Sequence, residues 1–203
     1  MNRTLQNFMN ELSSKNPVPG GGGASALIGA VGVSLCSMVA NLTLGKPQYA
    51  MYQEDIEVIL VRTEKSVERL LHLIHKDAEV FEPLSVAYYI PQDNPNREQI
   101  LEQALITASS VPMEILEEIY QIIDIMEQLL VKGSKLAISD VGVAASACRS
   151  ALEGAIMNVY INTKLMKNKE YALGLNAKAE AMLSEGVKRC NSIFQQITQE
   201  LKS

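Results

Sequence analysis

The chain has 203 residues, a net charge of −5 and a sequence pI of about 5.2. This length suffices for one domain with a sizeable core, and we expect residues 1–203 to form a single domain. The acidic balance gives no compositional support for nucleic-acid binding, so we expect no nucleic-acid partner. Three Phe, seven Tyr and no Trp leave the core to aliphatic residues and Met, which favours packed helices.

Apolar residues recur at helical spacing in almost every segment, and no segment alternates with the period of a strand. In chain order, the sequence predicts a short helix over 4–13, a Pro/Gly loop over 16–23, an apolar helix over 24–44, a long amphipathic helix over 50–89, a turn over 90–96, and helices over 97–131, 135–166 and 171–201. Pro83 and Pro112 should kink or break their helices. We therefore predict an all-α fold, an up-and-down bundle of about six helices.

A stretch without charged side chains runs from residue 16 to residue 45. It is long enough to cross a bilayer, which takes about 20 apolar residues, but many Gly and Ser residues dilute its apolar character. We therefore expect a buried helix and no membrane partner. The N-terminus lacks the basic-then-apolar order of a signal peptide, and three widely spaced cysteines indicate free thiols. These features predict a cytoplasmic protein.

Two predicted helices carry small residues at every fourth position. These positions are Ser25, Gly29, Val33 and Ser37 on the first helix, and Gly142, Ser146, Ser150 and Gly154 on the later one. Such stripes let helix backbones approach closely, and they can also leave room for a ligand. Close packing is the commoner reason for them.

Four consecutive glycines, Gly20 to Gly23, precede the apolar helix. Their backbone N–H groups are unobstructed and a helix start carries positive partial charge, so this segment could bind an anion. The spacing matches neither GxxxxGK[ST] nor GxGxxG, so the nucleotide motifs do not apply. A flexible loop is the alternative, although Pro17 and Pro19 restrict the backbone.

Two acidic residues lie in apolar stretches of predicted helices. Asp77 shares a helix face with Ile74 and Phe81, and a carboxyl group in such surroundings can have a raised pKa and act as a general acid. An ordinary exposed Asp is the alternative. Asp140 follows Ser139 in an otherwise uncharged run. A carboxylate there must cap a helix end, pair with a positive charge or take part in a functional site.

Asn158 and Asn162 lie one helical turn apart on the same predicted helix. Their amides both donate and accept hydrogen bonds, which suits a heteroaromatic ring with mixed edges. Solvation on a helix surface is the alternative for each of them. His72 and His75 have helical spacing but no evident third ligand, so we predict no metal site.

Together, these segments resemble the cyclodeaminase/cyclohydrolase family of folate enzymes. The similarity lies in the order and spacing of short pieces over nearly the whole chain. The pieces are Pro17-Val-Pro-Gly-Gly-Gly22, Met38-Val-Ala-Asn-Leu-Thr-Leu-Gly-Lys46 with Tyr49, Asp77-Ala-Glu-Val-Phe81, Val111-Pro112, Ser139-Asp140 and Asn158-Val-Tyr-Ile-Asn162. Four positions depart from the usual family pattern, namely Gly23, Pro47, Pro83 and Ser134.

The resemblance implies a helical-bundle homodimer that binds a tetrahydrofolate derivative, possibly polyglutamylated, and needs no cofactor. It places the catalytic proton donor on Asp77. The substrate-binding residues it implies are Gly20, Gly21, Gly22, Lys46, Ser139, Asp140, Asn158 and Asn162. For the anionic tail of a folate we expect Lys15 and Lys46 as partners, and for the pterin donors Asp140.

The reaction that the resemblance implies is conversion of 5-formiminotetrahydrofolate to 5,10-methenyltetrahydrofolate with release of ammonia. Hydrolysis of the methenyl compound to 10-formyltetrahydrofolate is the alternative reaction. A catalytically inactive helical dimer that binds folate or acts as a scaffold is the alternative without chemistry.

Overall fold

The computed structural model describes residues 4–203, and these form six α-helices and two short 3₁₀ helices without a β-strand. The α-helices are α1 (Leu5–Leu12), α2 (Gly21–Asn41), α3 (Gln53–Tyr88), α4 (Arg97–Lys132), α5 (Ile138–Leu165) and α6 (Lys169–Lys202), and the 3₁₀ helices are η1 (Pro47–Tyr52) and η2 (Lys135–Ala137). The prediction of an all-α fold with about six helices is confirmed.

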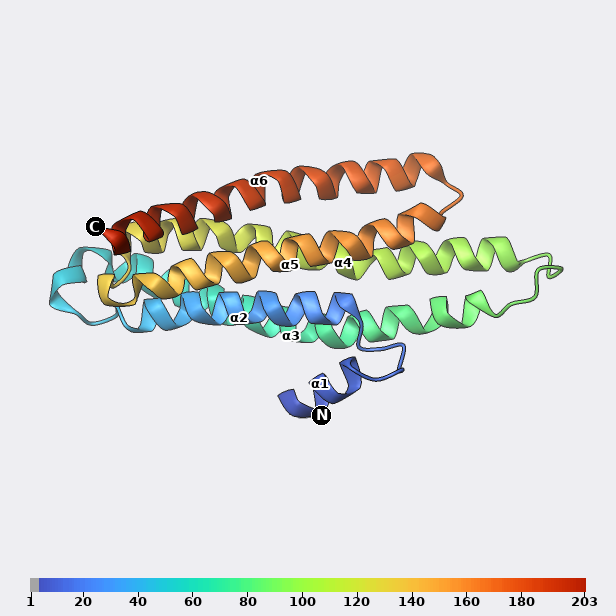
Figure 1. The fold of residues 1–203 in the computed structure, drawn as a ribbon, viewed down its shortest axis with the longest axis horizontal. Helices are drawn as coiled ribbons and strands as arrows, with labels where there is room; N and C mark the ends of the chain where they lie inside the picture. Colours follow the sequence, from blue (N-terminus) through green and yellow to red (C-terminus); the bar gives the residue numbers. More distant parts are fainter. Residues whose placement is uncertain (1–3) are drawn as a thin grey trace.

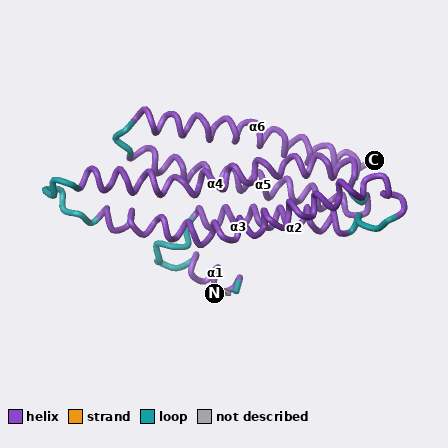
Figure 2. Tube along the Cα trace, turned by 180° about the vertical axis from the view of Figure 1, so that it is seen from behind, coloured by secondary structure: helices purple, strands orange, loops and turns teal. Residues whose placement is uncertain are grey.

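Helices α2 to α6 run up and down along one long axis, and α1 lies beside them near the middle (Figure 1). In this view α2 and α5 lie in front, α3 and α4 lie behind them, and α6 follows the upper edge. Helix α2 packs against α3 and α5, and α5 packs against α4 and α6. The view from behind places the loops that join α2 to α6 in succession at the two ends of the bundle, whereas the loop between α1 and α2 lies nearer the middle (Figure 2). The front of α2 and α5 is therefore an outer face that no other described helix covers.

Small residues explain how α2 fits between its neighbours. A Cβ atom added to Gly29 would lie 3.0 Å from Ile119 Cδ1, and one added to Gly32 would lie 2.8 Å from Cys148 Sγ. Both glycines are buried, so helices α4 and α5 approach the α2 backbone itself. The close packing predicted for the small-residue stripe is confirmed at Gly29, and Gly32, outside the stripe, packs equally closely.

Helix α2 is also the one helix among residues 4–203 that is long and apolar enough to span a bilayer by length and composition. Of its apolar window, 56% is buried inside the bundle. The core helix of a folded bundle passes the same test of length and composition.

The expected start of the apolar helix is wrong, and of the two outcomes expected at Pro83 a break does not occur. The Pro/Gly loop ends at Gly20, because Gly21 to Gly23 already belong to α2. Glycine is a poor helix former, but tertiary contacts outweigh this preference here, since Gly22 and Gly23 are buried against α3. Pro83 does not break α3, which continues to Tyr88. Pro83 lies on the exposed side of the helix, where water can bond to the carbonyl group that lacks its helical donor.

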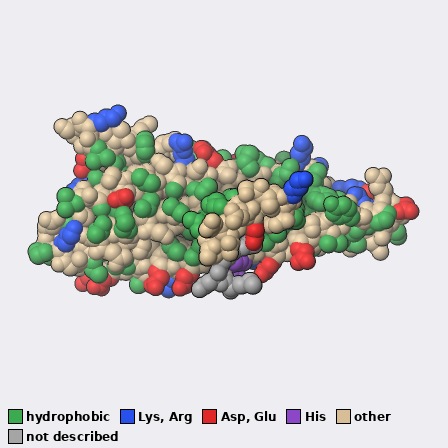
Figure 3. Space-filling model, turned by 60° about the horizontal axis from the view of Figure 1, so that its bottom comes forward, with side chains coloured by type: hydrophobic (Ala, Val, Ile, Leu, Met, Phe, Trp, Pro, Cys, Tyr) green, Lys and Arg blue, Asp and Glu red, His purple; other side chains and the backbone are tan. Residues whose placement is uncertain are grey.

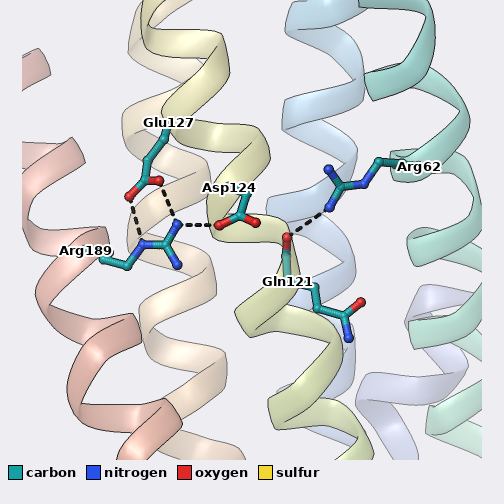
Figure 4. A network of polar contacts seen from close by, with 5 residues as sticks. All are labelled: Arg62, Gln121, Asp124, Glu127 and Arg189. Atoms are coloured by element: carbon teal, nitrogen blue, oxygen red, sulfur yellow. Dashed lines mark hydrogen bonds and ion pairs between the residues drawn. The ribbon is translucent and has the colours of Figure 1, made fainter. Parts of the chain in front are cut away.

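Charged side chains connect the outer helices. The Arg189 guanidinium on α6 donates to Glu127 Oε1 at 2.8 Å and to Asp124 Oδ1 at 2.5 Å, both on α4 (Figure 4). On the other side of α4, Arg62 of α3 donates to the Gln121 backbone carbonyl at 3.3 Å. These bonds connect α3 and α6 to α4. None of them involves α2 or α5, whose front is uncovered.

The three cysteines are free and buried, as expected for thiols in apolar surroundings. Burial raises the pKa of Cys36 to about 12 and that of Cys190 to about 11. These thiols therefore stay protonated and contribute to the core as small apolar groups.

Candidate active site

One pocket lies where the start of α2 meets the middle of α3 and α4 and the end of α5. It encloses about 180 Å³ and is lined by Pro17, Val18, Gly20, Gly21, Gly22, Asp77, Val80, Phe81, Ala108, Pro112, Asn158, Ile161 and Asn162. Sites that enclose a whole drug-sized ligand usually measure about 300–1,000 Å³. This pocket therefore has room for one ring system of a larger substrate, and the remainder would extend through its mouth.

Asp77 provides the only titratable side chain among the residues that line this pocket. Its carboxylate oxygen Oδ2 accepts a hydrogen bond of 2.9 Å from the Gly23 backbone N–H. Burial raises the pKa of Asp77, and the Gly23 N–H opposes this rise in part. The alternative of an ordinary exposed Asp is therefore wrong. A carboxyl group with a raised pKa in a pocket is a candidate for giving and taking a proton during a reaction.

The glycines at the start of α2 allow the helix to touch the polar side chains of the pocket. A Cβ atom on Gly22 would overlap the Asp77 carboxyl group, lying 2.6 Å from its Cγ. A Cβ atom on Gly21 would lie 3.2 Å from Asn158 Nδ2. One N–H of the run is bonded to Asp77 itself. Gly21 and Gly22 lack side chains, which allows the start of α2 to lie against Asn158 and Asp77. Beyond Gly20 the run is helical, so it is not a flexible loop.

The two asparagines predicted to bind substrate both line the pocket. Asn158 Nδ2 donates to the Gly154 carbonyl at 2.9 Å, which fixes the amide and leaves its oxygen available. Asn162 is 9% exposed and its side chain has no hydrogen-bond partner among residues 4–203. Both amides can therefore bond to a ligand in the pocket.

Ser25 supports this arrangement, a role that the sequence analysis did not assign to it. Its hydroxyl donates to the Gly21 carbonyl at 2.7 Å. A Cβ atom on Gly154 would lie 2.5 Å from this hydroxyl oxygen, so Gly154 leaves the space that Ser25 occupies. The only signal in the sequence was that both residues belong to the small-residue stripes.

Lys46, Ser139 and Asp140 do not join this pocket within one chain. Asp140 precedes Asn158 by 18 residues on the same helix α5, which corresponds to about 27 Å. Lys46 lies at the Asp140 end of the bundle, where its Nζ donates to Ser134 Oγ at 3.2 Å. In one chain, Asp140 therefore cannot bind a pterin that Asp77 contacts, contrary to the expectation from the sequence.

Lys46 belongs to a polar cluster at this second end of the bundle. Ser134 N–H donates to Thr43 Oγ1 at 2.8 Å, and Lys135 N–H donates to the Tyr49 hydroxyl at 2.9 Å. The bond from Lys135 lowers the pKa of Tyr49. Among residues 4–203, no carboxylate forms an ion pair with Lys46. The half-buried ammonium group is thus held in place with its charge uncompensated.

No group of three or more His, Cys, Asp or Glu side chains that could hold a metal ion occurs among residues 4–203. The absence of a metal from the working protein stays a prediction from the sequence.

The fold and the pocket together describe a helical bundle that presents one partly buried carboxyl group and two amides to a ring-sized ligand. Comparison with known proteins agrees with this class. Residues 4–181 match the model of the formiminotransferase-cyclodeaminase family. The chain belongs to this family, and it is an enzyme of the cyclodeaminase/cyclohydrolase type.

Three relatives illustrate the family. A methenyltetrahydrofolate cyclohydrolase of Methylorubrum extorquens is 35% identical over 188 residues, which cover 91% of this chain and 90% of the relative. The formimidoyltransferase-cyclodeaminase of Mus musculus is 27% identical over 91% of this chain, which spans only 35% of the mouse protein. The crystal structure of a formiminotetrahydrofolate cyclodeaminase from Thermotoga maritima superposes on this chain with a TM-score of 0.85 and 28% sequence identity. The match covers 97% of this chain and 98% of the Thermotoga chain.

Proposed function

We propose that this chain converts 5-formiminotetrahydrofolate to 5,10-methenyltetrahydrofolate and releases ammonia. The observation that carries the proposal is the Asp77 carboxyl group, held by the Gly23 N–H in a pocket without another titratable side chain. This reaction needs one group that moves one proton, and it needs no redox or metal chemistry. We therefore propose that no cofactor takes part, and a cytoplasmic location stays a prediction.

The proton transfer can be followed atom by atom. Substrate N10 attacks the carbon of the protonated formimino group, whose nitrogen becomes an amino group, and a new bond forms while N10 still carries its hydrogen. The Asp77 carboxylate takes this proton from N10 and, as a carboxylic acid, gives it to the amino group on the same carbon. The bond from carbon to nitrogen then breaks and ammonia leaves. The rest of catalysis is the positioning of N10 against the carbon, which rigid helices support.

Hydrolysis of the methenyl compound to 10-formyltetrahydrofolate is the second candidate. It is favoured by the 35% identity to a cyclohydrolase, of which this chain covers 90%. The same carboxyl group would serve, because it can take a proton from the attacking water and give it to N5 as that nitrogen leaves. The remaining hydroxyl proton is released to solvent as the C=O bond of the formyl group forms.

The two candidates are distinguished by near-ultraviolet absorbance, where methenyltetrahydrofolate absorbs. Purified protein is given 5-formiminotetrahydrofolate in one assay and methenyltetrahydrofolate in the other. A gain of absorbance in the first assay, faster than without protein, supports the cyclodeaminase. Accelerated loss in the second supports the cyclohydrolase. No change in either assay with folded protein would overturn both.

We further propose that the chain acts as a homodimer, joined through the uncovered front of α2 and α5, which we call the α2/α5 face. Large apolar side chains are exposed there, namely Ile28, Val31, Met38 and Leu42 on α2 and Val143, Met157 and Ile161 on α5. Together with the half-buried Ala24 and Leu35, the α2 positions are spaced alternately four and three residues apart. This spacing is typical of a seam between packed helices.

Charge and size also support a second copy as the partner of this face. Helix α2 contains no charged residue. Figure 3 shows the molecule turned so that the bottom of Figure 1 comes forward. Acidic side chains follow the lower edge of this view, and the broad area above them consists mostly of hydrophobic and uncharged atoms with few charged side chains. The face is about 30 Å long and about 20 Å wide, from the length of α2 and two adjacent helices. An area of this order approaches the roughly 800 Å² that each partner buries in a stable interface.

Placing a charge on the α2/α5 face should separate the dimer. We expect Val31→Asp to be monomeric at concentrations where the wild type is dimeric, because the new carboxylate would be buried without a partner. The matched control is Val58→Asp on α3, whose side chain is similarly exposed at 58% against 51% for Val31. Sedimentation velocity measures both variants. A monomeric wild type would contradict the proposal. Binding of the wild type to lipid vesicles, with no binding of Val31→Asp, would also contradict it.

A dimer across this face would also complete the site. The mouth of the pocket includes the exposed Gly21 and Ile161, which lie at one end of the face. Gly21 and Leu42 are about equally far from Val31, at the middle of α2. A twofold axis through that middle therefore brings the partner's Leu42 to Gly21 and the partner's Lys46 close to the mouth. We propose that Lys46 binds the carboxylates of the folate tail, polyglutamylated or not, across the interface.

Mixed dimers test whether Lys46 acts across the interface. We expect Lys46→Ala homodimers to lose roughly 10- to 100-fold in kcat/KM, because a hydrogen bond to a charged group contributes about 1.5–3 kcal/mol. A dimer of one Lys46→Ala and one Asp77→Asn subunit, isolated through two different tags, should recover about half of the wild-type activity. Its one intact pocket would combine Asp77 of the first subunit with Lys46 of the second.

The control is a dimer of Gly22→Ala and Asp77→Asn subunits, whose two defects lie in the same pocket and should not complement each other. Lack of recovery in the Lys46→Ala mixture would mean that Lys46 acts within its own chain, and full activity of the Lys46→Ala homodimer would mean that Lys46 does not bind the tail. An increase in KM for Lys15→Ala, with none for Lys46→Ala, would indicate that Lys15 binds the folate tail and that Lys46 does not.

A further inference from the structure

Pro112 lies inside α4 and lines the pocket together with Ala108, one helical turn before it. Proline has no backbone N–H, so the Ala108 carbonyl has lost the donor that would normally bond to it four residues later. Both residues are buried in the bundle apart from the pocket they line, so a donor from outside the helix would have to come from that pocket. The family piece Val111-Pro112 thus marks a carbonyl group that lacks its usual helical donor.

The neighbouring side chains do not satisfy this carbonyl. The hydroxyl of Thr107 donates to the Gln103 carbonyl, and that of Ser109 donates to the Leu105 carbonyl. The hydroxyl of Ser110 donates to the Thr107 carbonyl. Each hydroxyl group near Ala108 on α4 is therefore bonded to a different carbonyl.

The direction of the carbonyl follows from helix geometry. A helical C=O points along the axis towards the residue four positions later. Both Ala108 and Pro112 contribute to the wall of the same cavity, so the Ala108 oxygen lies on the side of α4 that faces Asp77, Asn158 and Asn162. The pocket thus contains a fixed acceptor whose position is set by main chain and does not depend on a rotamer.

We propose that the Ala108 carbonyl oxygen accepts a hydrogen bond from the amino group on the substrate's heteroaromatic ring. The proposal rests on the proposed function, in which this ring is a reduced pterin whose amino group and N3–H are donors. Asp140, expected from the sequence to bind these donors, lies about 27 Å along α5 from Asn158. Asp77 is used for proton transfer, so the Ala108 carbonyl adds a main-chain acceptor to the amide oxygens of Asn158 and Asn162 in the same pocket.

Restoring the missing N–H tests the proposal. In Pro112→Ala, the new N–H can bond to the Ala108 carbonyl and compete with the ligand. We expect the dissociation constant of a tetrahydrofolate to rise about tenfold, the scale of one lost hydrogen bond. The matched control is Pro83→Ala, which changes the other helical proline at an exposed position of α3 and should leave the dissociation constant unchanged.

A ligand without the ring amino group separates a lost hydrogen bond from a loosened pocket. The wild type should bind this 2-deamino analogue more weakly than the parent ligand, and Pro112→Ala should discriminate much less between the two. Equal discrimination by wild type and Pro112→Ala overturns the proposal, and so does an unchanged dissociation constant. Calorimetry measures binding without turnover, so failure here remains distinct from failure of the proposed reaction, which the absorbance assays report.

Discussion

Replacing Asp77 by Asn should lower kcat by about 10²- to 10⁴-fold, the usual contribution of a general acid–base group. The amide has nearly the same shape and its oxygen can still accept from Gly23 N–H, so the pocket should keep its form. It cannot carry the proton from N10 to the leaving amine. The absorbance assay measures the rate, and calorimetry with a tetrahydrofolate should report binding close to that of the wild type.

A nearby carboxyl group provides the control for this variant. Glu79 lies two residues further along α3, where it is exposed to solvent. Glu79→Gln removes the same charge from the same helix and should retain full activity. Full activity in Asp77→Asn would show that Asp77 is not the proton carrier, whatever the result for Glu79.

The same variant reports on the raised pKa of Asp77. Since burial raises this pKa in the folded state above its ordinary value of 3.8, the folded chain binds more protons than the unfolded chain between the two values. Stability conferred by the protonated group is therefore lost as pH rises through that window. The melting temperature of Asp77→Asn relative to the wild type should increase from acidic to neutral pH. A difference that does not change with pH would contradict the raised pKa.

Gly22→Ala should lower activity by about 100-fold or more while the helix content stays near that of the wild type. The added methyl group would lie 2.6 Å from Asp77 Cγ, so either the carboxyl group or the start of α2 must move. A displacement of about 1 Å at a catalytic group can cost roughly 100-fold in rate. Circular dichroism and the absorbance assay together measure this effect.

Gly174→Ala on α6 is the matched control, because nothing lies within 4 Å of the position where its Cβ would be. A helical Gly→Ala change in open space should leave activity unchanged and stabilise the fold by about 0.5–1 kcal/mol. Wild-type activity in Gly22→Ala would mean that the close contact with Asp77 is not required for catalysis.

The sequence was sufficient for the fold class and for the catalytic candidate. Helical periodicity recurs throughout the chain, and because each helix buries its apolar face against others, the bundle could be predicted from pattern alone. Asp77 could be found because a carboxyl group on an apolar helix face is unusual. Asn158 and Asn162 were found through their spacing of one turn, since both then face the same side.

Only the tertiary structure decided how these residues combine. Helical pattern could not reveal that Gly22 touches Asp77, because that contact joins two helices 55 positions apart in the sequence. The separation of Asp140 from Asn158, by contrast, follows from helical rise alone, because both lie on the same predicted helix. Local sequence fixes which residues share a face of one helix, whereas the packing of helices fixes which faces meet. The Ala108 carbonyl group, which Pro112 leaves without its usual helical donor, can belong to the active site only because helix packing places it in the same pocket as Asp77.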